Sequence, residues 1–400
     1  MASEVESERR DWRTDLLVIQ PTPFCNIDCS YCYLPHRTSK KRMSLELAEQ
    51  IFSKLFTFPT IRPDIGMVWH AGEPMVLPVS YYEEMFELVK RIAGPDRQVT
   101  HSFQTNGTLI TDEWCDFIRK WDVNVGLSID GPAEFHNLNR KYRNGSGSFA
   151  NAERGLQRLK QNGIPFYVIS VLTVPSLRVP DTMFDFYVAK GIDSVCFNIE
   201  EKEGNNTSSE LVDSPEFGKL YKEFLRRFFE LTAQRGEKMV LREFETAFRA
   251  IQHHGMGIGN QQAEPLSILS VDCDGNLSTF SPELLGTTHP TYGSFTFGNL
   301  TTDDFETIAA RVESSQVYAD IRAGIARCSK ECKYYKLCGG GPPANKIYEN
   351  NSANSTETVY CRSYQISVDA VLDMIDTRPE ASHLMLQTPT PAPVPEPATV

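Results

Sequence analysis

Short apolar runs alternate with longer amphipathic stretches along the first half of the chain. Runs of this length predict buried strands, and the amphipathic stretches between them predict helices. Several of these stretches begin at a Ser, Thr or Asp that can cap a helix. Six strand–helix units in series predict an α/β fold with a parallel sheet that curls towards a barrel and carries its chemistry at the carboxyl ends of the strands. The expected strands are 16–21, 67–71, 100–105, 123–129, 166–173 and 195–199, and the expected helices are 44–58, 80–92, 112–121, 149–161 and 180–190.

The pattern changes near residue 205, and this change suggests how the chain divides. We expect a flexible N-terminus at 1–13, a strand–helix core at 14–205, bridging helices and a loop at 206–265, a Cys-rich domain at 266–378 and a disordered Pro-rich tail at 379–400. The bridge should hold a helix at 216–235 and a flexible Gly-rich link, HHGMGIGN, at 253–260. The Cys-rich domain has little regular periodicity, so metal would have to hold its core together. Because the first strand starts so early, no separate N-terminal peptide-recognition domain fits ahead of it.

The composition then argues against several classes of protein. The chain has 400 residues, 40% of them hydrophobic, which is enough for more than one core. Its formal charge of -12 provides no basic surface for phosphate, so we expect no nucleic-acid partner. The N-terminus is charged and no apolar run reaches about 18 residues, so we expect no membrane span and a cytoplasmic location. There the ten cysteines should stay reduced and serve metal binding or catalysis.

Three cysteines follow the first expected strand with the spacing C-x3-C-x2-C, at Cys25, Cys29 and Cys32. Three thiolates on one loop can hold three irons of a [4Fe–4S] cube and leave the fourth iron without a protein ligand. An open coordination position is where a catalytic metal binds a cofactor or substrate. The alternatives are a zinc loop completed by His36 and three ordinary buried cysteines.

This triplet, with Tyr33 directly after it, resembles the signature of the radical S-adenosylmethionine (SAM) superfamily. The resemblance implies that the open iron chelates the amino and carboxylate groups of SAM. One electron from the reduced cluster then cleaves a C–S bond of SAM, and the resulting 5′-deoxyadenosyl radical abstracts a hydrogen atom. The implied fold is a partial (β/α)6 barrel similar to a TIM barrel.

Further motifs of this family come after the later expected strands, in the family's order. AGEP at 71–74 is similar to the family's GGEP segment, and QTNGTL follows at 104–109. LSIDGP at 127–132, with His136, Arg140 and the loop 145–149 after it, is similar to a run in peptide-modifying members. The resemblance places the SAM ribose and carboxylate at Ser128 and Arg140, and the adenine at Leu172. The implied cofactor contacts are Tyr31, Tyr33, Ala71, Gly72, Glu73, Gln104, Asn106, Ser128, Arg140 and Leu172.

A second cysteine set lies near the C-terminus with the spacing C-x3-C-x5-C-x22-C. Its members are Cys328, Cys332, Cys338 and Cys361. Four thiolates can close a complete [4Fe–4S] cluster, and tetrahedral zinc is the alternative. The segment resembles the SPASM domain, which carries auxiliary clusters in radical SAM peptide maturases. Phe280 and Pro342 stand at two cysteine positions of that pattern, so we expect one auxiliary cluster instead of two.

Three cysteines remain outside both sets. Cys273 is either a relocated cluster ligand or a thiol near the active site. Cys115, in an expected helix, and Cys196, in an expected strand, lie on apolar faces and should be simple core residues.

Over residues 14–372 the chain looks most like the maturases that form cyclophanes in Gly-rich repeat precursor peptides. The resemblance implies a bond between an aromatic ring carbon and the β-carbon of a residue two positions on, with a net loss of two hydrogens. It also implies a ribosomal precursor peptide as substrate and an electron donor such as flavodoxin or ferredoxin. No motif identifies the base for the ring proton, and Asp272, Asp274 and Glu283 are the nearby candidates.

Two other functions stay open at this point. A sulfatase-maturating enzyme would oxidise a Ser or Cys side chain to formylglycine, and members of that class use an aspartate just after the cysteine that Phe280 replaces. A non-catalytic iron–sulfur or zinc scaffold would carry electrons or organise a partner. The scaffold leaves the open iron position and the ordered SAM motifs unexplained.

Overall fold

The strands form one continuous, curved sheet that includes most of the predicted barrel and part of the Cys-rich region. The computed structural model describes residues 12–253 and 259–385. In that part of the chain, one sheet has the strand order β12-β9-β8-β1-β2-β3-β4-β5-β6-β7. Pairing is parallel from β8 through β1 to β7, and antiparallel between β8, β9 and β12. These strands are β1 (Thr14–Ile19), β2 (Ile61–Trp69), β3 (Gln98–Thr105), β4 (Asn124–Ser128), β5 (Tyr167–Leu172), β6 (Ser194–Ile199), β7 (Val240–Leu241), β8 (Ile268–Val271), β9 (Asn276–Thr279) and β12 (Gly298–Asn299), and β10 (Thr288–His289) pairs separately with β11 (Gly293–Ser294).

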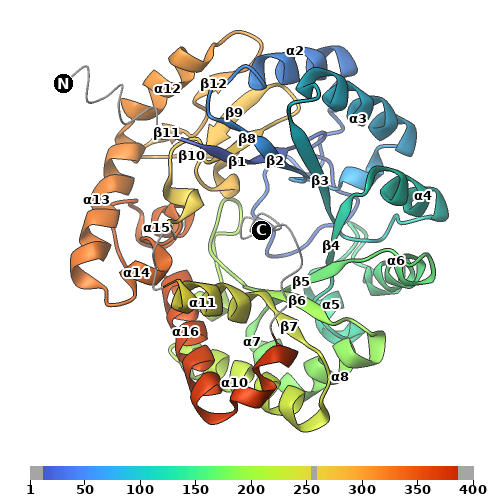
Figure 1. The fold of residues 1–400 in the computed structure, drawn as a ribbon, viewed down its shortest axis with the longest axis vertical. Helices are drawn as coiled ribbons and strands as arrows, with labels where there is room; N and C mark the ends of the chain where they lie inside the picture. Colours follow the sequence, from blue (N-terminus) through green and yellow to red (C-terminus); the bar gives the residue numbers. More distant parts are fainter. Residues whose placement is uncertain (1–11, 254–258, 386–400) are drawn as a thin grey trace.

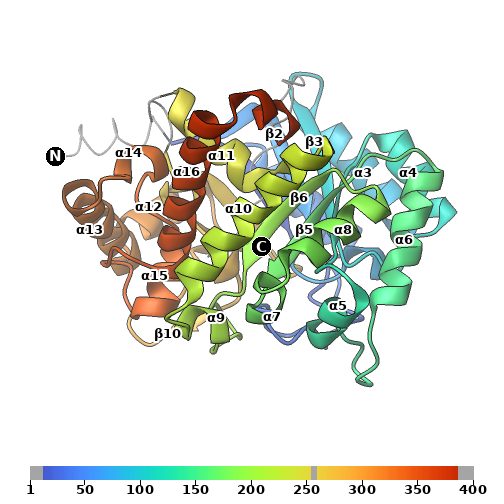
Figure 2. The ribbon, with the colours of Figure 1, turned by 90° about the horizontal axis from the view of Figure 1, so that it is seen from below.

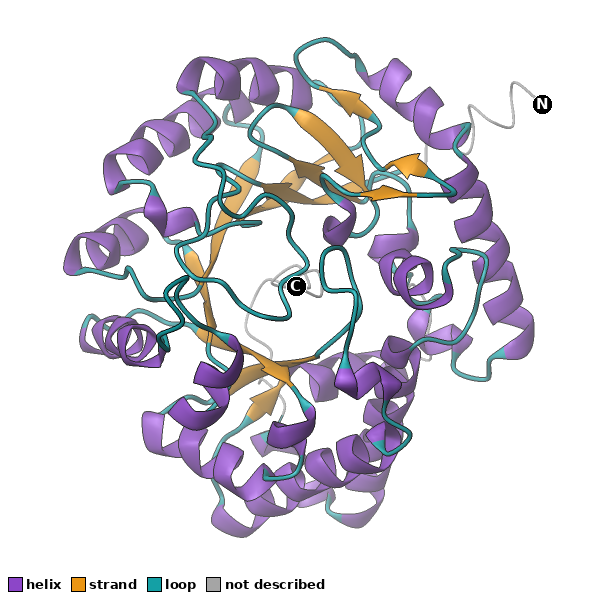
Figure 3. Cartoon of the chain, turned by 180° about the vertical axis from the view of Figure 1, so that it is seen from behind, coloured by secondary structure: helices purple, strands orange, loops and turns teal. Residues whose placement is uncertain are grey.

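Helices surround the outer side of this sheet (Figure 1), while loops lie across its inner side (Figure 3). The α-helices are α2 (Leu45–Leu55), α3 (Val79–Ala93), α4 (Asp112–Trp121), α5 (Ala133–Asn139), α6 (Phe149–Gln161), α7 (Val174–Leu177), α8 (Pro180–Lys190), α9 (Glu210–Asp213), α10 (Phe217–Arg235), α11 (Arg242–Gln252), α12 (Phe305–Glu313), α13 (Gln316–Glu331), α14 (Tyr335–Cys338), α15 (Pro343–Asn350) and α16 (Val359–Thr377). The 3-10 helices are η1 (Pro74–Val76), η2 (Gln261–Ala263), η3 (Pro282–Leu284) and η4 (Pro379–Leu384). No described helix is long and apolar enough to cross a membrane.

The alternation of apolar runs and amphipathic stretches correctly predicted the elements of the barrel. Helices α4, α6 and α8 begin and end at the predicted residues. The Ser44 hydroxyl accepts a hydrogen bond from the Leu47 amide at the start of α2, and Thr111 caps α4 in the same way. Strand β2 begins at Ile61, earlier than predicted, because its polar first residues extend the pairing with β3, where Asp64 lies opposite Gln98.

The bridge and the Cys-rich region differ from the prediction because they extend the barrel sheet. Strand β7 adds to β6 as a further parallel strand. Strand β8 pairs with β1 in parallel, with Leu16 opposite Ile268, so the Cys-rich region begins inside the same sheet. Leu16 and Val18 pack with Ile268 in a small buried cluster. This pairing between segments more than two hundred residues apart has no signal in local periodicity.

The weak periodicity of the Cys-rich region led us to expect a core held together by metal, but the region is largely helical. Helices α12, α13, α15 and α16 account for much of it. Buried apolar residues of these helices, such as Ile308, Ile321 and Val371, join the main core. Helix α16 packs beside α10 and α11 of the bridge (Figure 2). The region is therefore packed on the main apolar core, which metal would supplement.

The prediction of a disordered tail from residue 379 is wrong for its first part. Residues 379–384 form η4, and Met385 is fully buried. The Met239 amide donates to the Leu384 carbonyl at 2.9 Å, and the Leu241 amide donates to the Met385 carbonyl at 3.4 Å. The tail thus covers the free edge of β7. Residues 386–400, 1–11 and most of the predicted Gly-rich link lie outside the described residues.

Replacing Met385 tests this docking. Met385→Ala should lower the free energy of unfolding by about 2–5 kcal/mol, because it leaves a cavity at a fully buried position. Denaturant unfolding followed by circular dichroism measures the change. Leu372→Ala is the control, because Leu372 is 42% exposed and its truncation should change stability by less than about 0.5 kcal/mol. Equal effects of the two variants would show that the tail does not dock.

Candidate active site

The loop that carries Cys25, Cys29 and Cys32 follows β1 at the carboxyl edge of the sheet. It is fastened by the segment after α5: the Asp28 amide donates to the Lys141 carbonyl at 2.6 Å and the Ser30 amide to the Asn139 carbonyl at 3.0 Å. Burial raises the pKa of the Cys29 thiol to about 12 and also raises that of Cys25. Because the thiolate is the form that binds metal, metal binding at this loop would release protons.

All three thiols line one cavity of about 130 Å³ together with most of the predicted contact residues. The predicted residues in its wall are Cys25, Cys29, Tyr31, Cys32, Tyr33, Gly72, Glu73, Gln104, Asn106, Ser128 and Arg140. They come from the ends of β1 to β4 and the loops that follow them. The parallel register of the sheet brings these separate motifs together at one edge.

Glu73 ties two of these strand ends together. Its carboxylate accepts hydrogen bonds from the Met75 amide at 3.0 Å, the Thr105 hydroxyl at 2.7 Å and the Asn106 amide at 2.8 Å. Burial raises the pKa of Glu73 to about 7. The Asn106 side chain in turn lies 3.8 Å from the sulfur of Cys25. Glu73 therefore positions Asn106 against the cysteine loop.

Arg140 places a buried cation beside the same loop. Its Nε lies 3.0 Å from a carboxylate oxygen of Asp130, and its Nη1 lies 3.9 Å from the sulfur of Cys29. The guanidinium also stacks over the ring of Tyr31, whose hydroxyl donates to Asp130. A second oxygen of Asp130 accepts from the Val171 amide at 3.0 Å. A cation held this firmly can bind an anionic group at little further entropic cost.

In the part of the chain that the structure describes, some buried polar atoms of the cavity have no hydrogen-bond partner. They are Oε1 of Gln104 and Nδ1 of His70. The Gln104 amide nitrogen donates to the Ser128 hydroxyl at 3.0 Å, which directs the side chain. Burial lowers the pKa of His70 to about 4, so its ring is neutral. Because buried polar groups are normally paired, these atoms indicate a polar ligand in the cavity.

The second cysteine set surrounds another cavity, of about 500 Å³, which Cys328, Cys332, Cys338 and Cys361 all line. Three successive glycines, 339–341, have positive φ angles of 68, 113 and 74° and wrap the chain around it. A Cβ at Gly341 would come within 3.2 Å of the Cys361 sulfur. The Nζ of Lys346, a residue only 2% exposed, lies 3.6 Å from the Cys328 sulfur. Among the described residues, no three His, Cys, Asp or Glu side chains are placed to hold a single metal ion.

Cys273 lies in neither cavity. It lines a third one with His36, Lys41 and the two aspartates beside it, and in the described chain no other cysteine lines that cavity. Asp272 accepts from the Asp274 and Asn276 amides, both at 2.9 Å, and so closes the turn between β8 and β9. Asp274 forms an exposed ion pair with Lys41 at 2.9 Å. Cys115 and Cys196 are buried core residues, as predicted.

Comparison with known proteins then identifies the family. Residues 19–183 match the model of the Radical SAM superfamily. An uncharacterized protein of Synechocystis is 42% identical over 353 residues, which are 87% of this chain and 88% of that protein. The chain belongs to the radical SAM superfamily. It is therefore an enzyme of the class that binds a [4Fe–4S] cluster and SAM.

Relatives with names include a cysteine-type anaerobic sulfatase-maturating enzyme of Clostridium perfringens. It is 25% identical over 369 residues, covering 88% of this radical SAM enzyme and 94% of the relative. Two solved structures share the fold. Native anSMEcpe with bound AdoMet has a TM-score of 0.73 at 22% identity, over 90% of this chain and 98% of that one. Streptococcus suis SuiB bound to precursor peptide SuiA has a TM-score of 0.61 at 17% identity, and the match covers 90% of this chain and 79% of that one.

Two predicted contacts of the radical SAM site are placed differently from the others. Leu172 packs into the core, while Ile169 and Val171 line the cavity, because alternate residues of a strand face opposite sides. Ala71, in place of the family's glycine, has a φ of 64° and keeps the left-handed backbone that glycine would adopt without strain. Its carbonyl accepts from the Gln20 side chain at 2.5 Å. Ala71 therefore acts through its backbone.

No sequence motif pointed to the end of β6 or to the loop that follows it. Asn198, Ile199 and Glu200 line the cavity, as do Glu201 and Glu203 in the loop beyond them. The signal that could have found them is their position at the carboxyl end of a barrel strand. No motif of the family was matched there, so the sequence analysis assigned them no role.

Replacing Arg140 tests its expected role in SAM binding. Arg140→Met should raise the dissociation constant for SAM at least about ten-fold, because a charge-assisted hydrogen bond contributes roughly 1.5–3 kcal/mol. Anaerobic calorimetry on reconstituted enzyme measures it, with iron content as the check on folding. Arg140→Lys should lose part of the affinity, because it keeps the charge without the planar fork. Arg158→Met, at an exposed ion pair, is the control, and unchanged affinity in Arg140→Met would contradict the assignment.

Proposed function

We propose that this radical SAM enzyme crosslinks an extended Gly-rich precursor peptide. It joins an aromatic ring carbon to the β-carbon of the residue two positions on. The observation that carries this choice over sulfatase maturation is the pair Phe280 and Ser281, which stand where that class has a cluster cysteine followed by its aspartate base.

The surroundings of Phe280 support this argument. Phe280 is fully buried and stacks on Tyr318, with ring centroids 6.1 Å apart, and it meets Phe297 edge to face. Its φ of 71° is unusual for a bulky residue, so packing must hold it there. Ser281 is buried and accepts from the Ala344 amide at 3.3 Å. The position is built as apolar core, and neither residue offers a thiolate or a carboxylate.

The cavity at the first cysteine loop fits the family's cofactors, because it combines three thiols, a buried cation and polar atoms without partners. Cys25, Cys29 and Cys32 would hold the cluster. Arg140, Ser128 and Gln104 would orient the polar groups of SAM, and Ile169 and Val171 would flank its adenine. When bound, the cluster and SAM supply a 5′-deoxyadenosyl radical that abstracts a hydrogen atom.

The four-cysteine cavity fits a single auxiliary [4Fe–4S] cluster. Four thiolates would complete its ligation and leave no iron open. The buried ammonium of Lys346 lies beside one of these sulfurs, at Cys328. A positive charge there stabilises the reduced form of a cluster and raises its potential. The site is thereby suited to take up the electron that the substrate releases.

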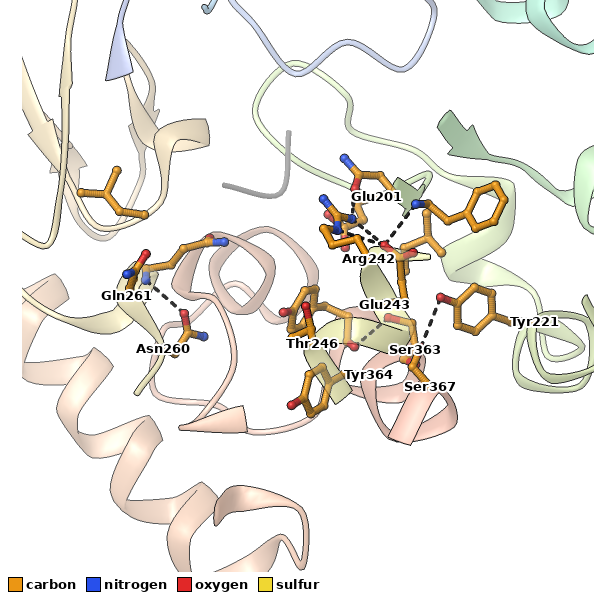
Figure 4. A pocket seen from close by; sticks show the side chains of 16 residues that line it. Glu201, Tyr221, Arg242, Glu243, Thr246, Asn260, Gln261, Ser363, Tyr364 and Ser367 are labelled. Carbon is orange, nitrogen blue, oxygen red and sulfur yellow. Dashed lines mark hydrogen bonds and ion pairs between the residues drawn. The ribbon is translucent and has the colours of Figure 1, made fainter. Parts of the chain in front are cut away.

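A polar cavity beside the SAM pocket supports a peptide substrate. It shares Asn198, Ile199 and Glu201 with that pocket and extends between α11, α16 and residues 260–262. Glu201, Arg242 and Glu243 gather in one part of it, away from Asn260 and Gln261 (Figure 4). Nη1 of Arg242 and Oε2 of Glu243 are buried, and neither has a hydrogen-bond partner among the described residues. A donor and an acceptor together suit the backbone of an extended peptide.

Co-expression with a small Gly-rich peptide that contains aromatic residues tests the reaction. The product should be lighter by two hydrogens per crosslink. Tandem mass spectrometry should show no backbone fragments between the aromatic residue and its partner two positions on. Normal fragmentation on both sides of one modified residue, with an aldehyde that reacts with hydrazine, would instead identify a reaction of the sulfatase-maturating type. The similarity to the sulfatase-maturating enzyme of Clostridium perfringens, at 25% identity, keeps this alternative open.

Iron analysis and two cysteine variants test the cofactor assignment. Reconstituted enzyme should bind about eight irons, as two [4Fe–4S] clusters. Cys29→Ala should abolish 5′-deoxyadenosine formation, whereas Cys361→Ala should keep some SAM cleavage but stop product formation. Cys115→Ala, at a core cysteine outside both sets, is the control and should keep all eight irons. Twelve irons in the wild-type enzyme, or SAM cleavage at the wild-type rate in Cys29→Ala, would overturn the assignment.

A further inference from the structure

Four carboxyl groups meet beside the SAM pocket, and they come from three separate segments. Glu201 and Glu203 lie in the loop after β6, Glu283 lies in η3, and Glu349 lies on α15. The charge on Glu203 interacts with all three of the others. Two of the four, Glu201 and Glu203, line the pocket itself. We call these four residues the carboxyl cluster.

The carboxyl cluster is poorly compensated for so buried a group. Glu283 is 1% exposed, and within residues 12–253 and 259–385 neither of its carboxylate oxygens has a hydrogen-bond partner. Arg242 partly compensates Glu201, and Arg362 and Lys202 partly compensate Glu349, whereas the strongest charge interactions of Glu203 are with the other three carboxyl groups. Burying unpaired carboxylates costs several kcal/mol each. A fold tolerates this arrangement where it serves a function.

Asn345 adds a buried amide to the carboxyl cluster. It is fully buried on α15, one turn before Glu349, and its amide interacts with the carboxyl groups of Glu201 and Glu349. Among the described residues, neither its oxygen nor its nitrogen makes a hydrogen bond of ordinary length and angle. Buried amides normally make closer hydrogen bonds than this. An amide-rich substrate such as a peptide backbone could complete them.

The loop that carries Glu201 and Glu203 is fixed to the cysteine loop. The Asn205 amide donates to the Tyr33 carbonyl at 2.9 Å, and a Cβ at Gly204 would come within 2.4 Å of the same oxygen. The Asn206 side chain holds the Glu201 carbonyl at 2.6 Å. Tyr33 directly follows the cysteine triplet. The carboxyl cluster therefore keeps its place beside the site of radical formation.

Burial raises the pKa of every carboxyl group in the cluster, and mutual repulsion adds to this for most of them. Burial, with the neighbouring carboxyl groups, raises the pKa of Glu201 and Glu283 to about 8, and burial raises that of Glu349 to about 7. The pKa of Glu203 is also raised, for the same reasons. The hydroxyls of Tyr33 and Tyr348 and the cations Arg242, Arg362 and Lys202 face the group. A general base works best when its pKa lies near the pH at which the enzyme operates.

We propose that Glu203, supported by Glu201 and Glu283, accepts the ring proton that the substrate loses during crosslinking. This inference rests on the proposed function. After the β-carbon radical adds to the aromatic ring, the new C–C bond leaves a ring radical that still carries its hydrogen. The ring C–H bond then breaks: the proton goes to the Glu203 carboxylate and one electron to an oxidised auxiliary [4Fe–4S] cluster, which restores aromaticity. Of the candidates named from sequence, Glu283 thus keeps a role, while Asp272 and Asp274 serve the β8–β9 turn.

The test separates hydrogen abstraction from proton loss. Reconstituted enzyme is given a peptide deuterated at the reacting β-carbon, and deuterium in 5′-deoxyadenosine is measured together with crosslinked peptide. Glu203→Gln should still transfer deuterium at close to the wild-type rate, while crosslinks per 5′-deoxyadenosine fall at least about ten-fold. Glu203→Asp should restore part of the yield. Glu283→Gln should also lower the number of crosslinks per 5′-deoxyadenosine, so the test does not depend on one variant folding.

The controls are chosen to exclude a structural effect. Iron content and the spectra of both clusters should match the wild type in every variant, and Glu210→Gln, an exposed carboxyl in α9, should behave as wild type. The proposal would be overturned if Glu203→Gln formed as many crosslinks per 5′-deoxyadenosine as the wild type. It would also be overturned if this variant lost deuterium transfer as well as crosslinked product. If the wild-type enzyme makes an aldehyde, the proposed function fails. The Glu203 comparison is then made on the aldehyde, whose formation also releases one proton and one electron.

Discussion

The parallel pairing of β1 with β2 on one side and β8 on the other is the constraint on which the active site depends. Ile19 lies opposite Trp69 of β2 and opposite Val271 of β8. The three strands therefore end side by side, and the cysteine loop, the AGEP segment and the β8–β9 turn leave the sheet at the same edge. Because β8 starts the Cys-rich region, this pairing also sets where the auxiliary cysteines lie relative to the SAM pocket.

The pocket has two electrostatic regions that suit successive steps of the reaction. Beside the cysteine loop, Arg140 is paired with Asp130 and fixed by Tyr31, which gives a rigid positive site for an anionic cofactor group. On the side of the β6 loop, the carboxyl cluster brings four carboxyl groups together, and burial raises the pKa of Glu201 and Glu283 to about 8. The first region would orient SAM, and the second would accept a proton from the substrate. Strong perturbation of buried titratable groups at both ends of one cavity is typical of active sites.

Local sequence predicted the helices of the barrel and most of its strands because each element has its own periodicity and caps. The helix Asp112–Trp121 was predicted to the residue, with Thr111 as its cap. The motifs also predicted most of the cavity wall, because each follows a strand. Leu172 was misplaced by one residue, since a motif gives a position along a strand, whereas the side of the strand that faces the cavity depends on register.

By itself, the sequence determined the chemistry that the chain can perform: thiol spacing fixes how many irons one loop can hold, and strand–helix alternation fixes where the loops meet. Only the tertiary structure decided which distant residues complete the site. The β1–β8 pairing, the docking of Met385 against β7 and the meeting of Glu203 with Glu283 and Glu349 all join segments tens to hundreds of residues apart. Such contacts depend on the shape of the assembled core, and neither periodicity nor motif spacing encodes that shape locally.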